Sequence, residues 1–245
     1  MCSSDLGETW IGTGAARDWI LESICRSALV HEPGSAAVYG DLDFIVLGAV
    51  IEAVTGQPLE RWCNERIFAP LGMTEARFLR APASEAERRR FAATENCPWR
   101  GRIVWGEVHD PNAAAMGGVA GHAGLFAPAD DVMRFGQALL DVWHGRSDAL
   151  PRERLVEFAT RQNLPQGSDW ALGWDTPSAG GSSSGQHFSA RSIGHLGFTG
   201  TSLWIDFDAQ AVVVMLTNRI HLVAKKSKFT LRAEIHDLVR EAFAA

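Results

Sequence analysis

The sequence predicts an α+β fold, in which an antiparallel sheet is flanked by helices and accompanied by an all-helical region. Two patterns carry this prediction. Apolar residues recur at helical spacing through the first half of the chain, and three strand-like segments follow one another near its end, before a terminal amphipathic helix. Strands grouped in this way favour an α+β domain over a doubly wound parallel sheet.

Three helices are expected near the start of the chain. The first covers residues 18–28, where apolar side chains recur on one side. Residues 42–54 are strongly apolar and long enough for a buried helix, and Thr55-Gly56 is a C-cap signal at their end. Pro58 begins the third helix, because proline at the first helical position gives up only an amide that has no partner there.

The middle of the chain is mostly irregular. Residues 80–115 are polar, with one strand expected at 102–108, and residues 117–124 form a glycine-dense loop. Residues 176–190 are rich in Gly and Ser and predict a flexible surface loop. Between these loops a helix is expected over 128–143. Its inward side chains would be Val132, Met133, Leu139, Leu140 and Trp143.

The end of the chain predicts a β-meander followed by a helix. Strand-like segments cover residues 192–196, 202–207 and 211–218, and residues 208–210 make the second hairpin turn. The last strand is continuously apolar over residues 212–216, as expected for a strand that is buried on both faces. The inward face of the terminal helix would carry Leu231, Ile235, Leu238, Val239 and Ala242.

Composition places the protein among ordinary globular domains. The 245 residues are 46% hydrophobic and 21% charged, enough for one large domain or two small ones. A net charge of −6 argues against nucleic acid, whose phosphates need a basic face. No apolar run approaches the roughly 18 residues of a membrane span. The 4 cysteines show no zinc spacing. No metal and no other cofactor is expected.

Three groups of segments carry a family resemblance. They are residues 33–41 with 55–59 and 67–73, then 109–113 with 117–126, and finally 194–201. In this order they resemble the β-lactamase-like, penicillin-binding serine hydrolase family, which includes class C β-lactamases, D-Ala-D-Ala carboxypeptidases and serine esterases. The resemblance implies a β-lactamase/transpeptidase-like fold.

The resemblance also implies a hydrolase domain over residues 7–245 that is incomplete at its N-terminus. The family's nucleophile belongs to a Ser-x-x-Lys motif, and no serine in this chain is followed three places later by lysine. The motif is therefore expected upstream of residue 1, and residues 1–6 are interpreted as a sequencing or cloning artefact. This chain by itself is expected to be inactive and poorly stable.

Two further motifs of the family match. Tyr39-Gly40-Asp41 corresponds to its Tyr-x-Asn/Asp turn, and His195-Leu196-Gly197 to its Lys/His-x-Gly strand. The resemblance implies that Tyr39 relays the serine proton, with a nearby cation lowering its pKa from about 10. Asp41 would hydrogen-bond the lysine or the substrate amide, and would also cap the following helix. His195 would donate a hydrogen bond to a substrate carboxylate and titrate near neutrality.

Four residues are expected to bind substrate. Gly197 would let the substrate backbone lie against the strand, and the Phe198 N–H would donate to the developing oxyanion. Thr199 follows them in the same motif. His122 either makes hydrogen bonds within the glycine-dense loop or lines the pocket.

Three other site hypotheses have less support. The G-x-S-x-G pattern at residues 181–185 lies in a low-complexity stretch with no strand before it. The glycines at 118–124 do not follow the dinucleotide-binding spacing. His109, Asp110 and His122 are of types that suit zinc, but their spacing fits no compact ligand pattern.

The sequence as a whole predicts a serine hydrolase that acts through an acyl-enzyme on D-alanyl peptides, β-lactams or small esters. The expected partner is thus a small-molecule or peptide substrate. The alternative is a non-catalytic, peptide-binding member of the same fold. The oligomeric state and the compartment are left open.

Overall fold

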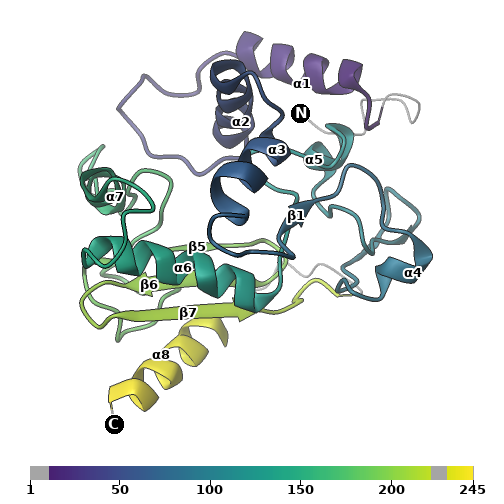
Figure 1. The fold of residues 1–245 in the computed structure, drawn as a ribbon. Helices are drawn as coiled ribbons and strands as arrows, with labels where there is room; N and C mark the ends of the chain where they lie inside the picture. Colours follow the sequence, from purple (N-terminus) through teal and green to yellow (C-terminus); the bar gives the residue numbers. More distant parts are fainter. Residues whose placement is uncertain (1–10, 222–230, 245) are drawn as a thin grey trace. The chain divides into compact units, whose positions relative to one another are not determined.

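The computed structural model describes residues 11–221 and 231–244, and the chain is made up of two compact units (Figure 1). The described part of the first unit is residues 11–30, 38–128 and 218–221. That of the second unit is residues 31–37, 129–217 and 231–244. The predicted domain start at residue 7 and the predicted artefact at 1–6 lie outside the described residues.

Helices dominate the first unit. Their bounds are α1 Gly14–Arg26, α2 Leu42–Thr55, α3 Leu59–Cys63, the π-helical turn η2 Asn64–Phe68, α4 Glu85–Arg88 and α5 Pro111–Ala115. The helices predicted at 42–54 and after Pro58 are confirmed. α1 begins earlier than the predicted residue 18, because the Thr13 side chain caps it by accepting the Ala16 N–H at 3.1 Å.

The core of the first unit joins α1, α2 and α5 to the glycine-dense loop. Its buried members are Ala16, Ile20, Ile45, Val108, Ala113, Ala115, Met116 and Ala120. α2 lies so close to the loop that a Cβ on Gly48 would be 3.0 Å from the Gly121 nitrogen. A Cβ on Gly121 would overlap the Phe44 carbonyl oxygen. The start of α2 and the loop are therefore held together by backbone packing.

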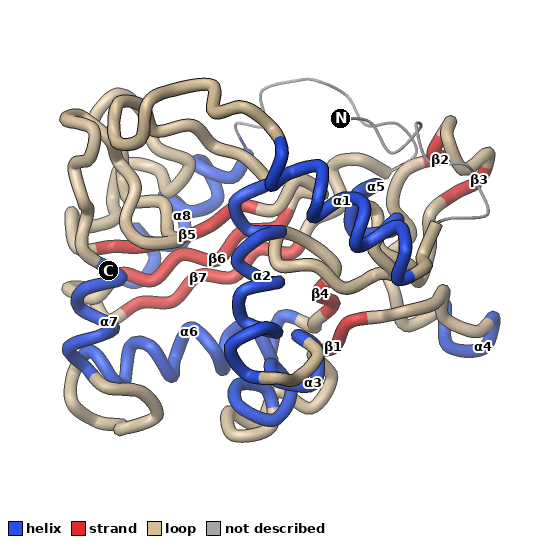
Figure 2. The backbone as a smooth tube through the Cα atoms, turned by 90° about the horizontal axis from the view of Figure 1, so that it is seen from above, coloured by secondary structure: helices blue, strands red, loops and turns tan. Residues whose placement is uncertain are grey.

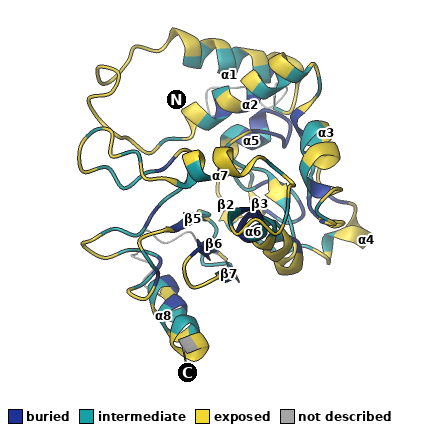
Figure 3. Ribbon diagram, turned by 60° about the vertical axis from the view of Figure 1, so that its left-hand side comes forward, coloured by how far each residue is buried: buried dark blue, intermediate teal, exposed yellow. Residues whose placement is uncertain are grey.

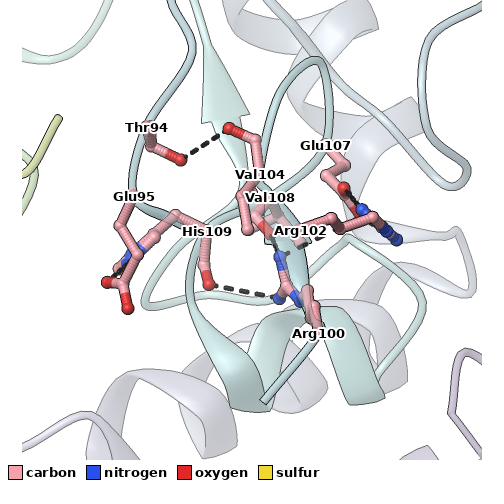
Figure 4. A network of polar contacts seen from close by, with 8 residues as sticks. All are labelled: Thr94, Glu95, Arg100, Arg102, Val104, Glu107, Val108 and His109. Atoms are coloured by element: carbon pink, nitrogen blue, oxygen red, sulfur yellow. Dashed lines mark hydrogen bonds and ion pairs between the residues drawn. The ribbon is translucent and has the colours of Figure 1, made fainter. Parts of the chain in front are cut away.

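The strands of the first unit form two short antiparallel pairs. β1 Arg77–Phe78 pairs with β4 Leu125–Phe126, and β2 Asn96–Cys97 pairs with β3 Arg102–Ile103. The strand predicted at 102–108 is thus much shorter, and Gly106 turns the chain with φ at 66°. The Arg100 guanidinium donates to the carbonyls of Val108 at 2.8 Å and His109 at 3.2 Å (Figure 4). These bonds occupy acceptors that a longer strand would have used.

The second unit is built on a three-stranded sheet. Its elements are α6 Ala129–Trp143, α7 Arg152–Ala159, β5 Ser192–Leu196, β6 Thr201–Asp206, β7 Ala211–Leu216 and α8 Leu231–Ala244. The strands lie side by side in the order β5-β6-β7, and both pairs are antiparallel (Figure 2). The predicted meander is confirmed, and so is its second hairpin turn, in which Gln210 takes a positive φ of 51°.

α6 and α8 cover opposite faces of this sheet (Figure 1). On β6, Ile205 packs in a cluster with Leu140 of α6. The next residue along the strand, Trp204, packs instead with Val213 of β7 and Val239 of α8. Successive side chains on a strand point to opposite faces, so β6 has a core on each side.

Burial along α6 and β7 differs from the prediction. Met133 is exposed rather than inward, because α6 comes closest to the sheet a turn later, at Gly136, where a Cβ would lie 2.6 Å from a Val212 methyl carbon. β7 alternates buried and half-buried residues instead of being buried on both faces, and Leu216 at its end is exposed. β7 is an edge strand of the described sheet, so its cover is incomplete.

α8 buries one side of the helix (Figure 3), and that side carries polar residues beside part of the predicted apolar face, since Val239 packs against the sheet. Leu231 and Leu238 are exposed, whereas Arg232 and His236 are buried. The loop predicted at 176–190 lies partly under this helix and is not wholly on the surface, since Ser184 within it is fully buried. Hydrogen-bond partners make the burial of these polar side chains tolerable.

No single helix in the described part of the chain is long and apolar enough to cross a membrane. α2 and the segment of α3 and η2 are together long and apolar enough, by length and composition only, and are bent by 77° relative to each other.

Candidate active site

Tyr39 and Asp41 lie directly before α2 in the first unit. Asp41 occupies the N-cap position of α2, and its carbonyl accepts the Ile45 N–H at 2.9 Å. Its side chain makes no capping hydrogen bond, so the predicted capping role is wrong. The reason is the backbone of Asp41, which is already helical at φ −82° and ψ −28° and not extended as a capping residue usually is.

The Tyr39 phenol is exposed and has an acidic neighbour. Partial burial raises the pKa of Tyr39 above 10.0, and the charge of Asp41 raises it further. The predicted cation would have the opposite effect. A lowered pKa at Tyr39 would therefore need a positive charge beyond those that the described residues bring to it.

His122 forms a buried pair with Asp110. Its Nε2 lies 2.7 Å from Asp110 Oδ1, and its side chain is 3% exposed. The same carboxylate oxygen accepts the Ala113 N–H at 2.8 Å and so caps α5. Burial alone would raise the pKa of Asp110, but the hydrogen bonds from His122 and Ala113 outweigh it and lower the pKa. Asp110 is thus ionised and fixes the orientation of the imidazole.

Asp41 completes a compact acidic group with this pair. One side-chain donor atom each from Asp41, Asp110 and His122 lie within 4.8 Å of one another. The described residues therefore bring two predicted site residues together and add Asp110, which sequence analysis considered only as a metal ligand. The Asp-Pro-Asn run at 110–112 is an N-cap signal that marked its position.

In this group the hydrogen-bonded Asp110–His122 pair lies beside a second carboxylate, that of Asp41. Two carboxylates and an imidazole are also donor types that bind divalent cations, although His122 Nε2 already bonds Asp110. His109, the third ligand of the metal hypothesis, pairs instead with Glu95 at 2.7 Å (Figure 4).

His195 lies near the end of β5 in the second unit, opposite Leu203 of β6. Its Nδ1–H donates to the Leu196 carbonyl at 3.0 Å, and the Trp170 ring lies 6.3 Å away, centroid to centroid. Burial lowers the pKa of His195, against a smaller opposing effect of the Leu196 hydrogen bond. The neutral ring therefore presents Nε2 as an acceptor, and it donates from Nε2 only when protonated.

Gly197, Phe198 and Thr199 lie in the turn that joins β5 to β6. The Gly197 N–H donates to the Thr201 carbonyl at 2.9 Å, and Phe198 is exposed. A Cβ on Gly197 would overlap the Thr201 hydroxyl, so a larger residue here would require the Thr201 side chain to rotate. The predicted set is accordingly divided: Tyr39, Asp41 and His122 belong to the first unit, and the residues of 195–199 to the second.

The fold is that of a β-lactamase-like hydrolase domain, with helices on both faces of an antiparallel sheet. Residues 4–237 match the family model described as Beta-lactamase, and the chain belongs to this family.

Two curated relatives carry the same name. A protein of Escherichia coli K12 named "Putative D-alanyl-D-alanine carboxypeptidase" is 36% identical over 222 residues, covering 82% of this chain and 49% of the relative. A protein of the same name from Salmonella agona is 33% identical over 219 residues. The chain spans about half the length of the curated relatives it matches. It is a member of the β-lactamase family whose curated relatives carry the name of a putative carboxypeptidase.

Solved structures agree on the fold. A β-lactamase from Mycobacterium bovis aligns with a TM-score of 0.60 and 21% identity, over 89% of this chain and 68% of its own. Simvastatin synthase from Aspergillus terreus aligns with a TM-score of 0.64 and 19% identity, over 94% of this chain and 60% of its own. At this identity the likeness concerns the fold alone.

Proposed function

We propose that the protein acts through an acyl-enzyme on D-alanyl peptides, β-lactams or small esters, with a serine as the nucleophile. Tyr39 relays the serine proton, Asp41 binds the lysine or the substrate amide, and His195 binds a substrate carboxylate. The observation that carries this proposal is the direction of the Asp41 carboxylate. It does not cap α2 but lies beside the Asp110–His122 pair, where it is available for a site.

The proposed substrate class begins with peptides that end in a carboxylate. The relatives that cover 82% of this chain carry names that describe D-alanyl-D-alanine carboxypeptidases. A protonated His195 suits the terminal carboxylate of such a peptide, because a charged imidazole donates a strong hydrogen bond to it.

The proposal places the nucleophile outside these 245 residues, none of which forms a Ser-x-x-Lys motif. It also assigns residues 7–245 to the hydrolase domain, which is inactive without that motif. The coding sequence upstream of this chain tests both statements, because an acylating enzyme requires a Ser-x-x-Lys there.

Active-site labelling of the complete gene product tests the function. We expect a fluorescent penicillin or a fluorophosphonate to label it covalently, and Tyr39→Phe to slow labelling by about 10²-fold or more, as loss of a proton-transfer group does. Phe158→Leu, at an exposed aromatic residue of α7, is the control and should label like the wild type. Absence of labelling in the complete protein would refute the proposal.

The second candidate is a non-catalytic, peptide-binding member of the same fold. It predicts that the complete gene product binds D-alanyl peptides in calorimetry without releasing D-alanine. A replaced serine or lysine in the upstream motif would support this candidate over the enzyme.

A further inference from the structure

α8 places a buried arginine behind the turn that joins β5 to β6. Arg232 is 8% exposed. Its Nη2 donates to the Gly197 carbonyl at 2.6 Å and to the Thr201 carbonyl at 2.9 Å. These carbonyls belong to the first residue of the turn and to the first residue of β6, so one guanidinium nitrogen spans the base of the turn.

The Gly197 carbonyl and the Phe198 N–H belong to the same peptide group. A trans peptide is planar, and its C=O and N–H point in opposite directions. The one cis bond among the described residues is at Leu164-Pro165, so this peptide is trans. The Gly197 carbonyl accepts from Arg232 and also, within the turn, from the Gly200 N–H at 3.1 Å. Because Arg232 holds this carbonyl toward α8, the Phe198 N–H points away from α8. A rotation of this peptide would break a buried, charge-assisted hydrogen bond.

A second polar residue fixes α8 at the same place. His236 follows Arg232 by one helical turn and is fully buried. Its Nε2 lies 3.1 Å from the Ser202 hydroxyl, directly after the turn, and its Nδ1 bonds the Ser183 carbonyl at 2.9 Å. Burial lowers the pKa of His236, and the nearby Arg232 charge lowers it further. The neutral imidazole thus anchors the helix without repelling the guanidinium.

We propose that Arg232 is a positioning residue for acyl transfer, which orients the Gly197–Phe198 peptide so that the Phe198 N–H is preorganised as an oxyanion donor. This inference rests on the proposed function. A preorganised donor acts on the charge that develops in the transition state, so its loss lowers kcat and affects substrate binding much less.

The test compares Arg232 variants of the complete gene product with a matched control on the same helix. Arg232→Gln removes the cation, and Arg232→Lys keeps a cation that can donate. The control is Arg240→Lys, since Arg240 faces Asp206, with 3.6 Å between Nη2 and Oδ2, and does not bond the turn. Turnover of a small ester gives kcat and KM. Inhibition by phenylboronic acid, whose adduct puts an oxygen where the oxyanion forms, reports on the donor.

We expect Arg232→Gln to lower kcat by about 10- to 100-fold, somewhat less than the loss of a whole oxyanion donor, with KM changed by less than about threefold. Inhibition by the boronic acid should weaken by a similar factor. Arg232→Lys should retain more activity than Arg232→Gln, and Arg240→Lys should match the wild type in both measurements.

Three outcomes would overturn the inference. If the wild type neither turns over esters nor binds the boronic acid, the proposed function fails and this inference with it. If the wild type is active and Arg232→Gln keeps its kcat and boronic acid affinity, only the positioning role fails. If Arg232→Gln does not fold, Arg232→Met, which also lacks the donor, takes its place, and unchanged kcat and inhibition in that variant would refute the role.

Discussion

Asp110 Oδ1 and His122 Nε2 lie 2.7 Å apart, and the same oxygen accepts the Ala113 N–H at 2.8 Å. One carboxylate thus joins the N-terminus of α5 to the glycine-dense loop. Both hydrogen bonds favour its ionised form and, despite its burial, lower the pKa of Asp110. The pair should therefore make the stability of the first unit depend on pH.

Asp110→Asn should reveal this dependence. The folded-state pKa lies below the unfolded value of about 3.9, so the stabilisation is fully present above that pH and is lost as the pH falls through the folded pKa. We expect the variant to lose about 1–2 kcal/mol of unfolding free energy at pH 7, and the difference to shrink below about pH 4. Urea denaturation at several pH values measures it, with the exposed Asp148→Asn as control. A difference independent of pH would contradict the role of the charge.

Gly121→Ala tests the backbone contact that holds α2 to the loop. An added Cβ would overlap the Phe44 carbonyl oxygen, and a backbone atom inside a helix cannot give way without moving the helix. We expect a loss of about 1–3 kcal/mol in unfolding free energy. Gly40→Ala is the matched control, since its Cβ would meet nothing within 4 Å, and should stay within about 0.5 kcal/mol of the wild type. Equal effects of the two substitutions in thermal melts would refute the contact.

Local patterns were sufficient to predict most elements of the fold. A strand or helix is signalled within its own segment, as in α2, whose apolar run ends at Gly56 with a positive φ of 67°. Such local patterns could not predict which side of α8 is buried. Periodicity treats Arg232 and His236 as outward, because the partners that make their burial favourable are carbonyls and a hydroxyl far away in sequence, 35 residues for Gly197.

In the candidate site, too, the sequence predicted the segments but not the contacts between side chains. The motifs located Tyr39, Asp41 and His195 as segments, but not the contacts that their side chains make. Asp41 does not cap α2, because its backbone is already helical. Asp110 acquires its place in the site through His122, 12 residues further along, and only the folded loop brings the two together.

Asp175 should give the folding stability a second pH dependence, of opposite sign. Its backbone bonds Gly194 of β5 in both directions, at 2.8 and 2.9 Å. Burial raises the pKa of Asp175 to about 6. A raised folded-state pKa means that the protonated form stabilises the fold, so this contribution is present below about pH 4 and is lost as the pH rises through the folded value.

Asp175→Asn should therefore stabilise the second unit at neutral pH. We expect a gain of about 1–2 kcal/mol in unfolding free energy at pH 7.5 after solvent screening, because the amide removes the cost of a partly buried charge, and a much smaller gain at pH 4.5. Thermal melts at the two pH values measure this. A variant that is less stable than the wild type at pH 7.5 would show that the ionised carboxylate is favourably bonded instead.

His195 should make the binding of carboxylate-bearing substrates stronger in acid. Its Nδ1–H is engaged with the Leu196 carbonyl at 3.0 Å, so Nε2 can donate to a substrate carboxylate only after it gains a proton. Burial lowers the pKa of His195 from 6.5. In the complete protein, KM for a D-alanyl peptide should accordingly rise by about tenfold as the pH increases through this lowered value, since a charge-assisted hydrogen bond is worth about 1.5–3 kcal/mol.

Two comparisons isolate this effect. His195→Lys keeps a cation throughout, so its KM for the peptide should be flat from about pH 5 to 8. A neutral ester has no carboxylate to bind, and its KM should not follow the His195 titration in the wild type. If the wild-type KM for the peptide is also flat over this range, His195 does not donate to the carboxylate, and its place on β5 next to Trp170 has a packing role.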